Sequence, residues 1–273
     1  MLKYNKNEPF QKLRDLIFSY FIAHPNEAEQ FKTELNNLRE AEDFYDFVIP
    51  SIQHRKFETT AKFKGITKDG FCSFDWNNKT LNIPTLDKNW ATNYVPSLLI
   101  EQLPGSPHRY MNYKKKGKVL VDCGAAEGFF ALDNIEGFEK IVLIDGDQKW
   151  IRALKKTFEI FLGDNVEIVE SFLTAENFEK FDVLNNPLDD SVIKLDIEGY
   201  ETEIISQLLY KQQTAKNIDI LVCCYHKQDD FQVVKQFAEY YNFSIDVNPG
   251  WMLFVYYNLE PPFFRRGVVR LYK

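Results

Sequence analysis

The sequence is poor in cysteine, glycine and proline, and it has no long hydrophobic run. Its four cysteines, none in a Cys-x-x-Cys spacing, predict buried free thiols and argue against a zinc site. Twelve glycines and 11 prolines are too few for a low-complexity or collagenous chain. No apolar run approaches the ~20 residues that cross a bilayer, and the first residues lack the apolar stretch of a signal peptide. We therefore expect a cytoplasmic protein without a membrane span.

Positive charge is also in short supply. The chain has 33 Lys and Arg against 40 Asp and Glu, a formal net charge of −7. This balance argues against a surface that follows a phosphate backbone, so we expect no nucleic-acid partner. Apolar residues are abundant: 45% of the 273 residues are hydrophobic and 15% are aromatic. It is therefore long and apolar enough for one large domain, or one domain with a smaller appendage.

The first part of the chain has the pattern of an appendage. Leu13, Ile17 and Phe21 recur at helical spacing and predict an amphipathic helix. A second helix is expected to start at Asn26, in a capping-box spacing, and to continue to Pro50. Such apolar stripes usually pack on the chain's own core, and a homodimer formed through this region is the alternative.

A change of period near residue 57 predicts a small β-meander. The turn signals Lys68-Asp69-Gly70 and Asn77-Asn78 separate three short alternating segments that end near Ile83. We assign residues 1–85 to an extension made of the helices and this meander, and residues 86–273 to the main domain. Within the main domain, the stretch 89–116 is expected to be irregular because it contains several prolines.

From residue 118 onward, strand-like and helix-like segments alternate. The expected strands span residues 118–123, 140–144, 166–169, 191–195 and 218–224. The expected helices span residues 127–136, 148–161, 200–210 and 229–241. This alternation predicts a parallel sheet covered by helices on both faces. Two last strands, near 243–248 and 252–258, are joined by so short a link that they must be antiparallel.

In an open α/β sheet the ligand binds at the carboxyl ends of the strands, so the residues there carry the chemistry. The first strand ends in a bend with Gly124 and Gly128, where small residues let the backbone approach a ligand. Ala126 stands where the dinucleotide fingerprint requires glycine. The second strand ends at Asp145, which is placed to accept hydrogen bonds from ribose hydroxyls. Alternatively, Asp147 or Asp145 caps the following helix. Together they indicate an adenosine cofactor.

Two further strand ends concentrate ionisable groups. The fourth strand ends Asp196-Ile197-Glu198-Gly199-Tyr200-Glu201, where three carboxylates would repel one another unless a cation or hydrogen-bond donors lie nearby. The fifth ends Tyr225-His226-Lys227, which puts a histidine at the same edge of the sheet. A histidine titrates near neutral pH and is a natural proton acceptor, although a lone histidine is as often structural.

These motifs resemble the FkbM family of S-adenosylmethionine-dependent methyltransferases. The resemblance rests on residues 122–128, Asp145, residues 193–201, and Tyr225-His226-Lys227 followed by Asp229-Asp230. Ser106-Pro107-His108-Arg109-Tyr110 adds to it, and the similarity covers residues 104–273. The glycine bend departs from the common pattern only at Ala126, which is also small.

The resemblance implies a class I methyltransferase (Rossmann-like) fold, a seven-stranded α/β sheet with an antiparallel last strand. It implies O-methylation of a hydroxyl on a sugar, glycan or natural-product acceptor. The cofactor-binding residues that it implies are Asp122, Gly124, Ala125, Ala126, Glu127, Gly128, Asp145, Ser171, Phe172 and Asp196. In this arrangement Asp145 holds the ribose, and Asp196 lies beside the methyl-transfer centre.

For catalysis, His226 is the first candidate for the general base and Asp196 the second. A Mg²⁺ ion held by Asp196, Glu198 and His226 is a less favoured alternative. The residues expected to bind the acceptor are His108, Arg109, Glu198, Tyr225, Trp251 and Arg265. Two other functions share parts of this pattern. One is an NAD-type oxidoreductase, which should have the full glycine fingerprint, and the other is a nucleoside-binding module without catalysis.

Overall fold

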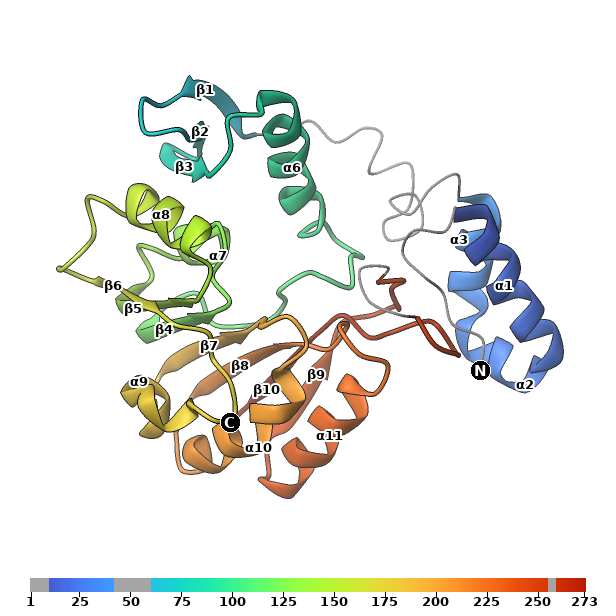
Figure 1. The fold of residues 1–273 in the computed structure, drawn as a ribbon. Helices are drawn as coiled ribbons and strands as arrows, with labels where there is room; N and C mark the ends of the chain where they lie inside the picture. The colour runs from blue at the N-terminus through green and yellow to red at the C-terminus, as the bar shows by residue number, and fades with distance from the viewer. Residues whose placement is uncertain (1–9, 42–59, 255–258) are drawn as a thin grey trace.

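The molecule is built on one large mixed sheet with helices on both faces (Figure 1). The computed structural model describes residues 10–41, 60–254 and 259–273. In their spatial order, the strands of this sheet are β6 (Val166–Glu170), β5 (Phe138–Asp145), β4 (Gly117–Cys123), β7 (Ser191–Leu195), β8 (Ile218–Cys223), β10 (Val268–Tyr272) and β9 (Ser244–Val247). Strands β6, β5, β4, β7 and β8 pair in parallel, and β10 is antiparallel to both of its neighbours.

This strand order confirms the predicted fold class. The first strand of the sheet, β4, lies in the middle, and the chain moves outward in one direction and then in the other. The last strand, β10, inserts between β8 and β9 and runs against both. A seven-stranded α/β sheet with this antiparallel strand is the class I methyltransferase arrangement that the resemblance to the FkbM family implies. The reversal of strand order beside β4 marks the edge where such sheets bind ligands.

Helices cover both faces of the sheet because the residues of its central strands are buried on both sides. Neighbouring residues such as Leu120 and Val121 are both fully buried but belong to different hydrophobic clusters, one on each face. The helices on one face are α6 (Lys88–Ile100), α7 (Phe129–Asp133) and α8 (Gln148–Thr157). The helices on the other face are α9 (Asp182–Asn185), α10 (Glu201–Gln212) and α11 (Asp230–Tyr240).

The N-terminal helices of the extension form a third hydrophobic cluster with the C-terminal part of the chain. These helices are α1 (Phe10–Ala23), α2 (Pro25–Ala28), the 3₁₀ turn η1 (Glu29–Phe31) and α3 (Lys32–Glu40). Leu13, Ile17 and Phe21 are buried as predicted, and they pack with Leu253 and Phe263. Among the described residues, no helix combines the length and apolar character that crossing a lipid bilayer requires.

The predicted second helix is only partly correct. It begins at Pro25 after His24, and no side chain caps it, so the predicted cap at Asn26 is wrong. A 3₁₀ turn interrupts it, and it ends at Glu40 because Ala41 is extended. The rest of the predicted helix lies outside the described residues.

The small meander is confirmed as a three-stranded antiparallel sheet. It is made of β1 (Lys62–Ile66), β2 (Cys72–Trp76) and β3 (Lys79–Ile83). Asn77 and Asn78 both have positive φ, as a two-residue hairpin turn requires. The amide of Asn82 donates to the hydroxyl of Thr157 on α8, which attaches the meander to the main sheet's helices. The assignment of residues 1–85 to one unit stays a prediction.

Two expectations for the main domain are wrong. Residues 88–100 form a helix where we expected irregular chain, because Asp87 caps it and its buried face outweighs the hydrogen bond lost at Pro96. The partner of β9 is β10, not a strand at 252–258. Met252 forms a single bridge with Arg265, and residues 255–258 lie outside the described part.

Candidate functional site

A cavity of about 590 Å³ lies at the carboxyl ends of β4, β5, β6 and β7. This size is in the range of small-molecule sites. It is lined by six of the predicted cofactor residues, namely Gly124, Ala126, Asp145, Ser171, Phe172 and Asp196. A wider and more open hollow, between the meander and the start of β6, contains none of the predicted residues. The topology therefore brings the predicted strand ends together at one site.

The bend after β4 is held in a backbone conformation that favours small residues. Gly124, Ala126 and Gly128 all have positive φ, including a value of 44° at Ala126. The amides of Gly124 and Ala125 donate to the carbonyl of Ile144, which fixes the bend to the end of β5. A Cβ atom at Gly124 would overlap the backbone carbonyl of Asp196. Close approach of two strand ends is thus the reason for glycine at this position.

Replacing Gly124 by alanine should destabilise the protein far more than the same change at Gly105. Both glycines have positive φ, but a Cβ at Gly105 meets no atom within 4 Å. Gly105→Ala therefore measures the left-handed strain alone, about 1–2 kcal/mol. Gly124→Ala adds the clash with Asp196, so we expect a total loss of at least ~3 kcal/mol in urea unfolding. Equal losses in the two variants would contradict the close approach.

Asp145 is turned toward the bend and not toward the helix that follows. Its Oδ2 atom accepts a hydrogen bond of 2.8 Å from the amide of Ala126, and its Oδ1 atom accepts one from the amide of Asp147. The cap of α8 is Asp147, whose side chain accepts from the amide of Lys149. The helix-cap alternative for Asp145 is therefore wrong. Each of its oxygens keeps a lone pair for a hydroxyl in the cavity.

A buried lysine, Lys194, links the two acidic strand ends. Its Nζ atom donates to Oδ1 of Asp122 and to the carbonyl of Gly124, both at 2.9 Å, and lies 3.6 Å from Oδ2 of Asp196. Burial opposes the charged form of each group. The carboxylates of Asp122 and Asp196 nevertheless raise the pKa of Lys194. Asp122 was predicted to bind the cofactor, but it is fully buried and does not line the 590 Å³ cavity. It binds Lys194 instead.

A second, smaller cavity of about 170 Å³ adjoins the first. The two cavities share Gly124, Ala126, Asp196 and Glu198. The smaller one is closed by aromatic side chains, by Tyr94 and Leu98 of α6, and by Glu101 and Gln102 in the turn that follows this helix. These wall residues were not predicted from the sequence, because residues 89–116 were expected to be irregular. Asp87, a capping residue before a periodic apolar pattern, was the available signal.

Glu127 lines this second cavity and accepts a hydrogen bond of 2.9 Å from the hydroxyl of Tyr94. Burial raises the pKa of Glu127 to about 7, although the hydrogen bond from Tyr94 and the charge of Lys194 oppose the shift. Of the other predicted cofactor residues, Ala125 also lines the second cavity, and Gly128 packs against α8.

Stability should fall as pH rises through the titration of Glu127. Because its pKa is raised on folding, the folded state holds the proton more tightly than the unfolded chain. The stabilisation of the folded state by protonated Glu127 is complete below pH 4.5, and it is lost as pH rises to about 7. We expect wild type to lose on the order of 2 kcal/mol relative to Glu127→Gln over this interval, measured by urea unfolding. Glu136→Gln, at an exposed position, is the control and should follow wild type.

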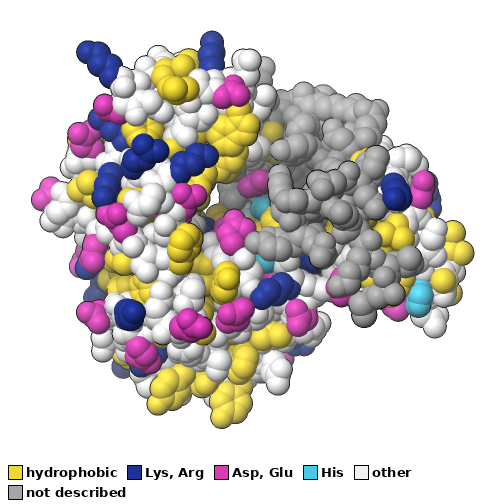
Figure 2. All heavy atoms as spheres, viewed as in Figure 1, with side chains coloured by type: hydrophobic (Ala, Val, Ile, Leu, Met, Phe, Trp, Pro, Cys, Tyr) yellow, Lys and Arg dark blue, Asp and Glu magenta, His cyan; other side chains and the backbone are white. Residues whose placement is uncertain are grey.

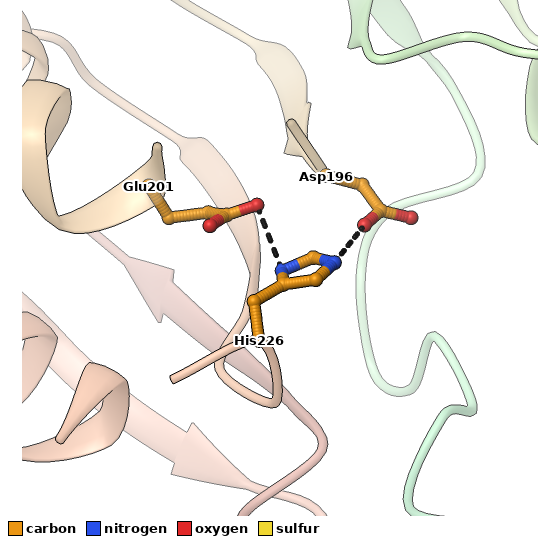
Figure 3. Close-up of side chains that lie close together, drawn as sticks. All are labelled: Asp196, Glu201 and His226. Atoms are coloured by element: carbon orange, nitrogen blue, oxygen red, sulfur yellow. Dashed lines mark ion pairs between the residues drawn. The ribbon is translucent and has the colours of Figure 1, made fainter. Parts of the chain in front are cut away.

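His226 lies between Glu201 and Asp196 (Figure 3) and lines neither cavity. Its side chain is 1% exposed. The Nδ1 atom is 3.1 Å from Oε1 of Glu201, and the Nε2 atom is 3.7 Å from Oδ1 of Asp196 and 3.8 Å from Oε2 of Glu198. Tyr225 donates to the same Asp196 oxygen at 3.0 Å. Among the two candidates for the base, Asp196 is thus the one that faces the cavities.

The donor atoms around His226 also have the chemistry of a metal site. One ligand atom each from Asp196, Glu201 and His226 lies within 4.8 Å of the others. The predicted Mg²⁺ site consisted of Asp196, Glu198 and His226. In the structure, the third member of the group is Glu201 and not Glu198. However, Glu201 already accepts a hydrogen bond of 2.7 Å from the amide of Ile197 and faces the imidazole directly. The imidazole thus has Asp196 and Glu201 as ion-pair partners, while Oε2 of Glu201 is buried without a hydrogen-bond partner among the described residues.

The six predicted acceptor residues fall into two groups. His108, Glu198 and Tyr225 line the second cavity, and the rings of His108 and Tyr225 stack 4.6 Å apart. The other three, Arg109, Trp251 and Arg265, line neither cavity.

Two members of the second group have structural roles. Arg265 is buried, and its guanidinium donates to the carbonyls of Tyr225 and His226. Trp251 packs on Phe31 of the extension and under the guanidinium of Arg266. Neither cavity supports a place for them in an acceptor pocket, and their role in binding the acceptor stays a prediction.

Comparison with known proteins gives one curated relative and many solved structures of the same fold class. The chain is 25% identical over 149 residues to "Ribosomal RNA small subunit methyltransferase A" of Mycoplasma mycoides subsp. mycoides SC. The match covers 50% of this chain, and the chain spans about half (54%) of that relative's length. No family model matches the chain.

Two of the solved structures illustrate the likeness. Methyltransferase FkbM from Methylobacillus flagellatus KT is 14% identical with a TM-score of 0.41, covering 59% of this chain and 45% of that one. TYW2 of M. jannaschii in complex with AdoMet is 11% identical with a TM-score of 0.45, covering 76% and 87%. The fold assignment rests on the strand order described above.

Proposed function

We propose that the protein is an S-adenosylmethionine-dependent O-methyltransferase of the FkbM type that acts on a hydroxyl of a sugar, glycan or natural product. The observation that carries this proposal is the pair of adjoining cavities, which meet at Asp196 and Glu198. The larger one suits a nucleoside, and the smaller one leads from it to a set of aromatic and acidic side chains. The curated relative, itself a methyltransferase, supports the reaction class.

The residues around the larger cavity fit S-adenosylmethionine. When bound, this cofactor supplies a methyl group that is already activated as a sulfonium. Asp145 offers carboxylate lone pairs that would bind the two ribose hydroxyls, and the ring of Phe172, packed against Gly146, would border the adenine. The carboxylates of Asp196, Glu198 and Glu127 would surround the positively charged methionine portion.

In this proposal the protein aligns the acceptor oxygen and receives its proton. The oxygen–carbon bond forms as the sulfur–carbon bond breaks, and the sulfur keeps the electron pair. A hydroxyl becomes strongly acidic as it gains the methyl group, so a carboxylate is a sufficient base. Burial opposes the charged form of Asp196, but Lys194, His226 and Tyr225 lower the pKa of Asp196 and keep it anionic. Asp196 therefore replaces His226 as our first candidate for the base.

Methylation of RNA is the second candidate function, because the curated relative is named for ribosomal RNA. Two observations favour a small acceptor instead. The second cavity is small and carries the carboxyl groups of Glu101, Glu127, Asp196 and Glu198. On the face shown in Figure 2, basic and acidic side chains of the described residues are interspersed. A phosphate backbone is bound most strongly by a continuous basic surface.

Methyl transfer from labelled S-adenosylmethionine to two substrate panels tests the proposal. One panel contains sugars, glycans and hydroxylated natural products, and the other contains total and ribosomal RNA. We expect label in hydroxyl acceptors and its loss in Asp196→Asn. Label in RNA alone would favour the second candidate.

Calorimetry distinguishes the two remaining alternatives. Binding of NAD in place of S-adenosylmethionine would contradict both methyltransferase candidates and support an oxidoreductase. Binding of S-adenosylmethionine without any methylated product would indicate a binding module.

A further inference from the structure

Glu201 is a fully buried carboxylate at the first residue of α10, and it contacts the imidazole of His226. Its Oε1 atom accepts a hydrogen bond of 2.7 Å from the amide of Ile197 and lies 3.1 Å from Nδ1 of His226. The first contact ties Glu201 to the loop that carries Asp196. The second orients the imidazole ring, so that Nε2 points at Asp196 (Figure 3).

Charged groups from four parts of the fold face this imidazole. Besides Glu201 on α10, they are Asp196 and Glu198 after β7, Asp230 at the start of α11, and Arg265, whose guanidinium donates to the carbonyl of His226. Three carboxylates approach the ring nitrogens within 3.1–3.8 Å. The single guanidinium binds the backbone and not the ring. The surroundings therefore favour a positively charged imidazole.

We propose that Glu201 is a positioning residue of the methyl-transfer site, which acts by holding His226 as a charged imidazolium directed at Asp196. This inference rests on the proposed function for its catalytic meaning, but its physical content concerns the protein alone. Asp196 is flanked by two cations, Lys194 at 3.6 Å and His226 at 3.7 Å. Lys194 is fixed by Asp122 and Gly124. In the same way, Glu201 fixes the position of His226.

The same carboxylates determine the direction in which the pKa of His226 is shifted. Burial opposes the charged ring, but Glu201 first, and then Asp196 and Glu198, raise the pKa of His226 above its usual value. In Glu201→Gln the amide oxygen can still accept from Nδ1, so orientation is partly kept while the negative charge is lost. The variant thus separates the charge of Glu201 from its volume.

Titration of the His226 imidazole by nuclear magnetic resonance, in the protein without cofactor, tests the proposal. We expect a midpoint above ~6.5 in wild type and a fall of about one pH unit in Glu201→Gln. Glu203→Gln, an exposed neighbour on the same helix that pairs with Lys227, is the matched control and should leave the midpoint unchanged. A wild-type midpoint at or below ~6.5, or an unchanged midpoint in Glu201→Gln, would overturn the proposal.

A second variant and a second readout cover the other outcomes. If Glu201→Gln does not fold, Glu201→Asp keeps the charge and should keep the raised midpoint, and a midpoint at the usual value would overturn the proposal. In methyl-transfer assays, Glu201→Gln should lower kcat about tenfold or more and leave the KM for S-adenosylmethionine within about twofold. Because the titration needs no substrate, failure of the proposed function would leave its result intact.

Discussion

Asp145→Asn should weaken the binding of S-adenosylmethionine about 100-fold. The substitution keeps the shape of the side chain but replaces one carboxylate oxygen by a donor. That donor would face either the amide of Ala126 or that of Asp147, which both donate to Asp145. The ribose loses a charged acceptor as well, and hydrogen bonds to charged groups contribute about 1.5–3 kcal/mol each. Calorimetric titration with S-adenosylmethionine and S-adenosylhomocysteine measures the change.

The control for this prediction is Asp133→Asn. Asp133 lies at the end of α7, is partly exposed and pairs with Lys115 at 3.3 Å, outside both cavities. It should bind the cofactor as wild type does. If Asp145→Asn retains wild-type affinity, the carboxylate does not hold the ribose, and the placement of the nucleoside in the larger cavity is wrong.

Lys194→Met should lower the free energy of unfolding by about 3–5 kcal/mol. Methionine has nearly the length of lysine but no charge, so the loss reports the ion pairs and not a cavity. Without Lys194, the fully buried Asp122 has no cation beside it among the described residues. Removal of one partner of a buried pair leaves the other charge desolvated and uncompensated. Urea unfolding at neutral pH measures the loss.

A double variant distinguishes an uncompensated charge from poor packing. Asp122→Leu combined with Lys194→Met removes both members of the pair, which lie 2.9 Å apart. We expect the double variant to be more stable than Lys194→Met alone, because no orphaned carboxylate remains at residue 122. A double variant that is less stable than both single variants would show that the pair acts mainly through packing.

The sheet could be predicted from sequence because its strands are buried on both faces. Continuous apolar runs such as residues 141–144 leave few alternatives to a parallel central strand. The ends of these strands were predictable for the same reason. It could therefore also be predicted that Gly124, Asp145 and Asp196 meet at one cavity. General rules for parallel sheets place such residues at one edge.

What could not be predicted depends on contacts between residues far apart in the chain. Pro96 suggested irregular chain, but the buried face of α6 outweighs its cost. The run at 252–258 and the strand β10 are both apolar, and the sequence does not show that Leu253 packs with the N-terminal helices. In the same way, nothing local shows that Trp251 packs on Phe31, or that Lys194 pairs with Asp122.

The most direct test of the account is a crystal structure of the protein with S-adenosylhomocysteine. We predict the ribose hydroxyls within hydrogen-bond distance of Asp145, the adenine beside Phe172, and the amino-acid portion passing between Glu127 and Asp196. The sulfur should point toward the second cavity. A nucleoside bound elsewhere, or a cavity that stays empty at saturating ligand concentration, would contradict the account.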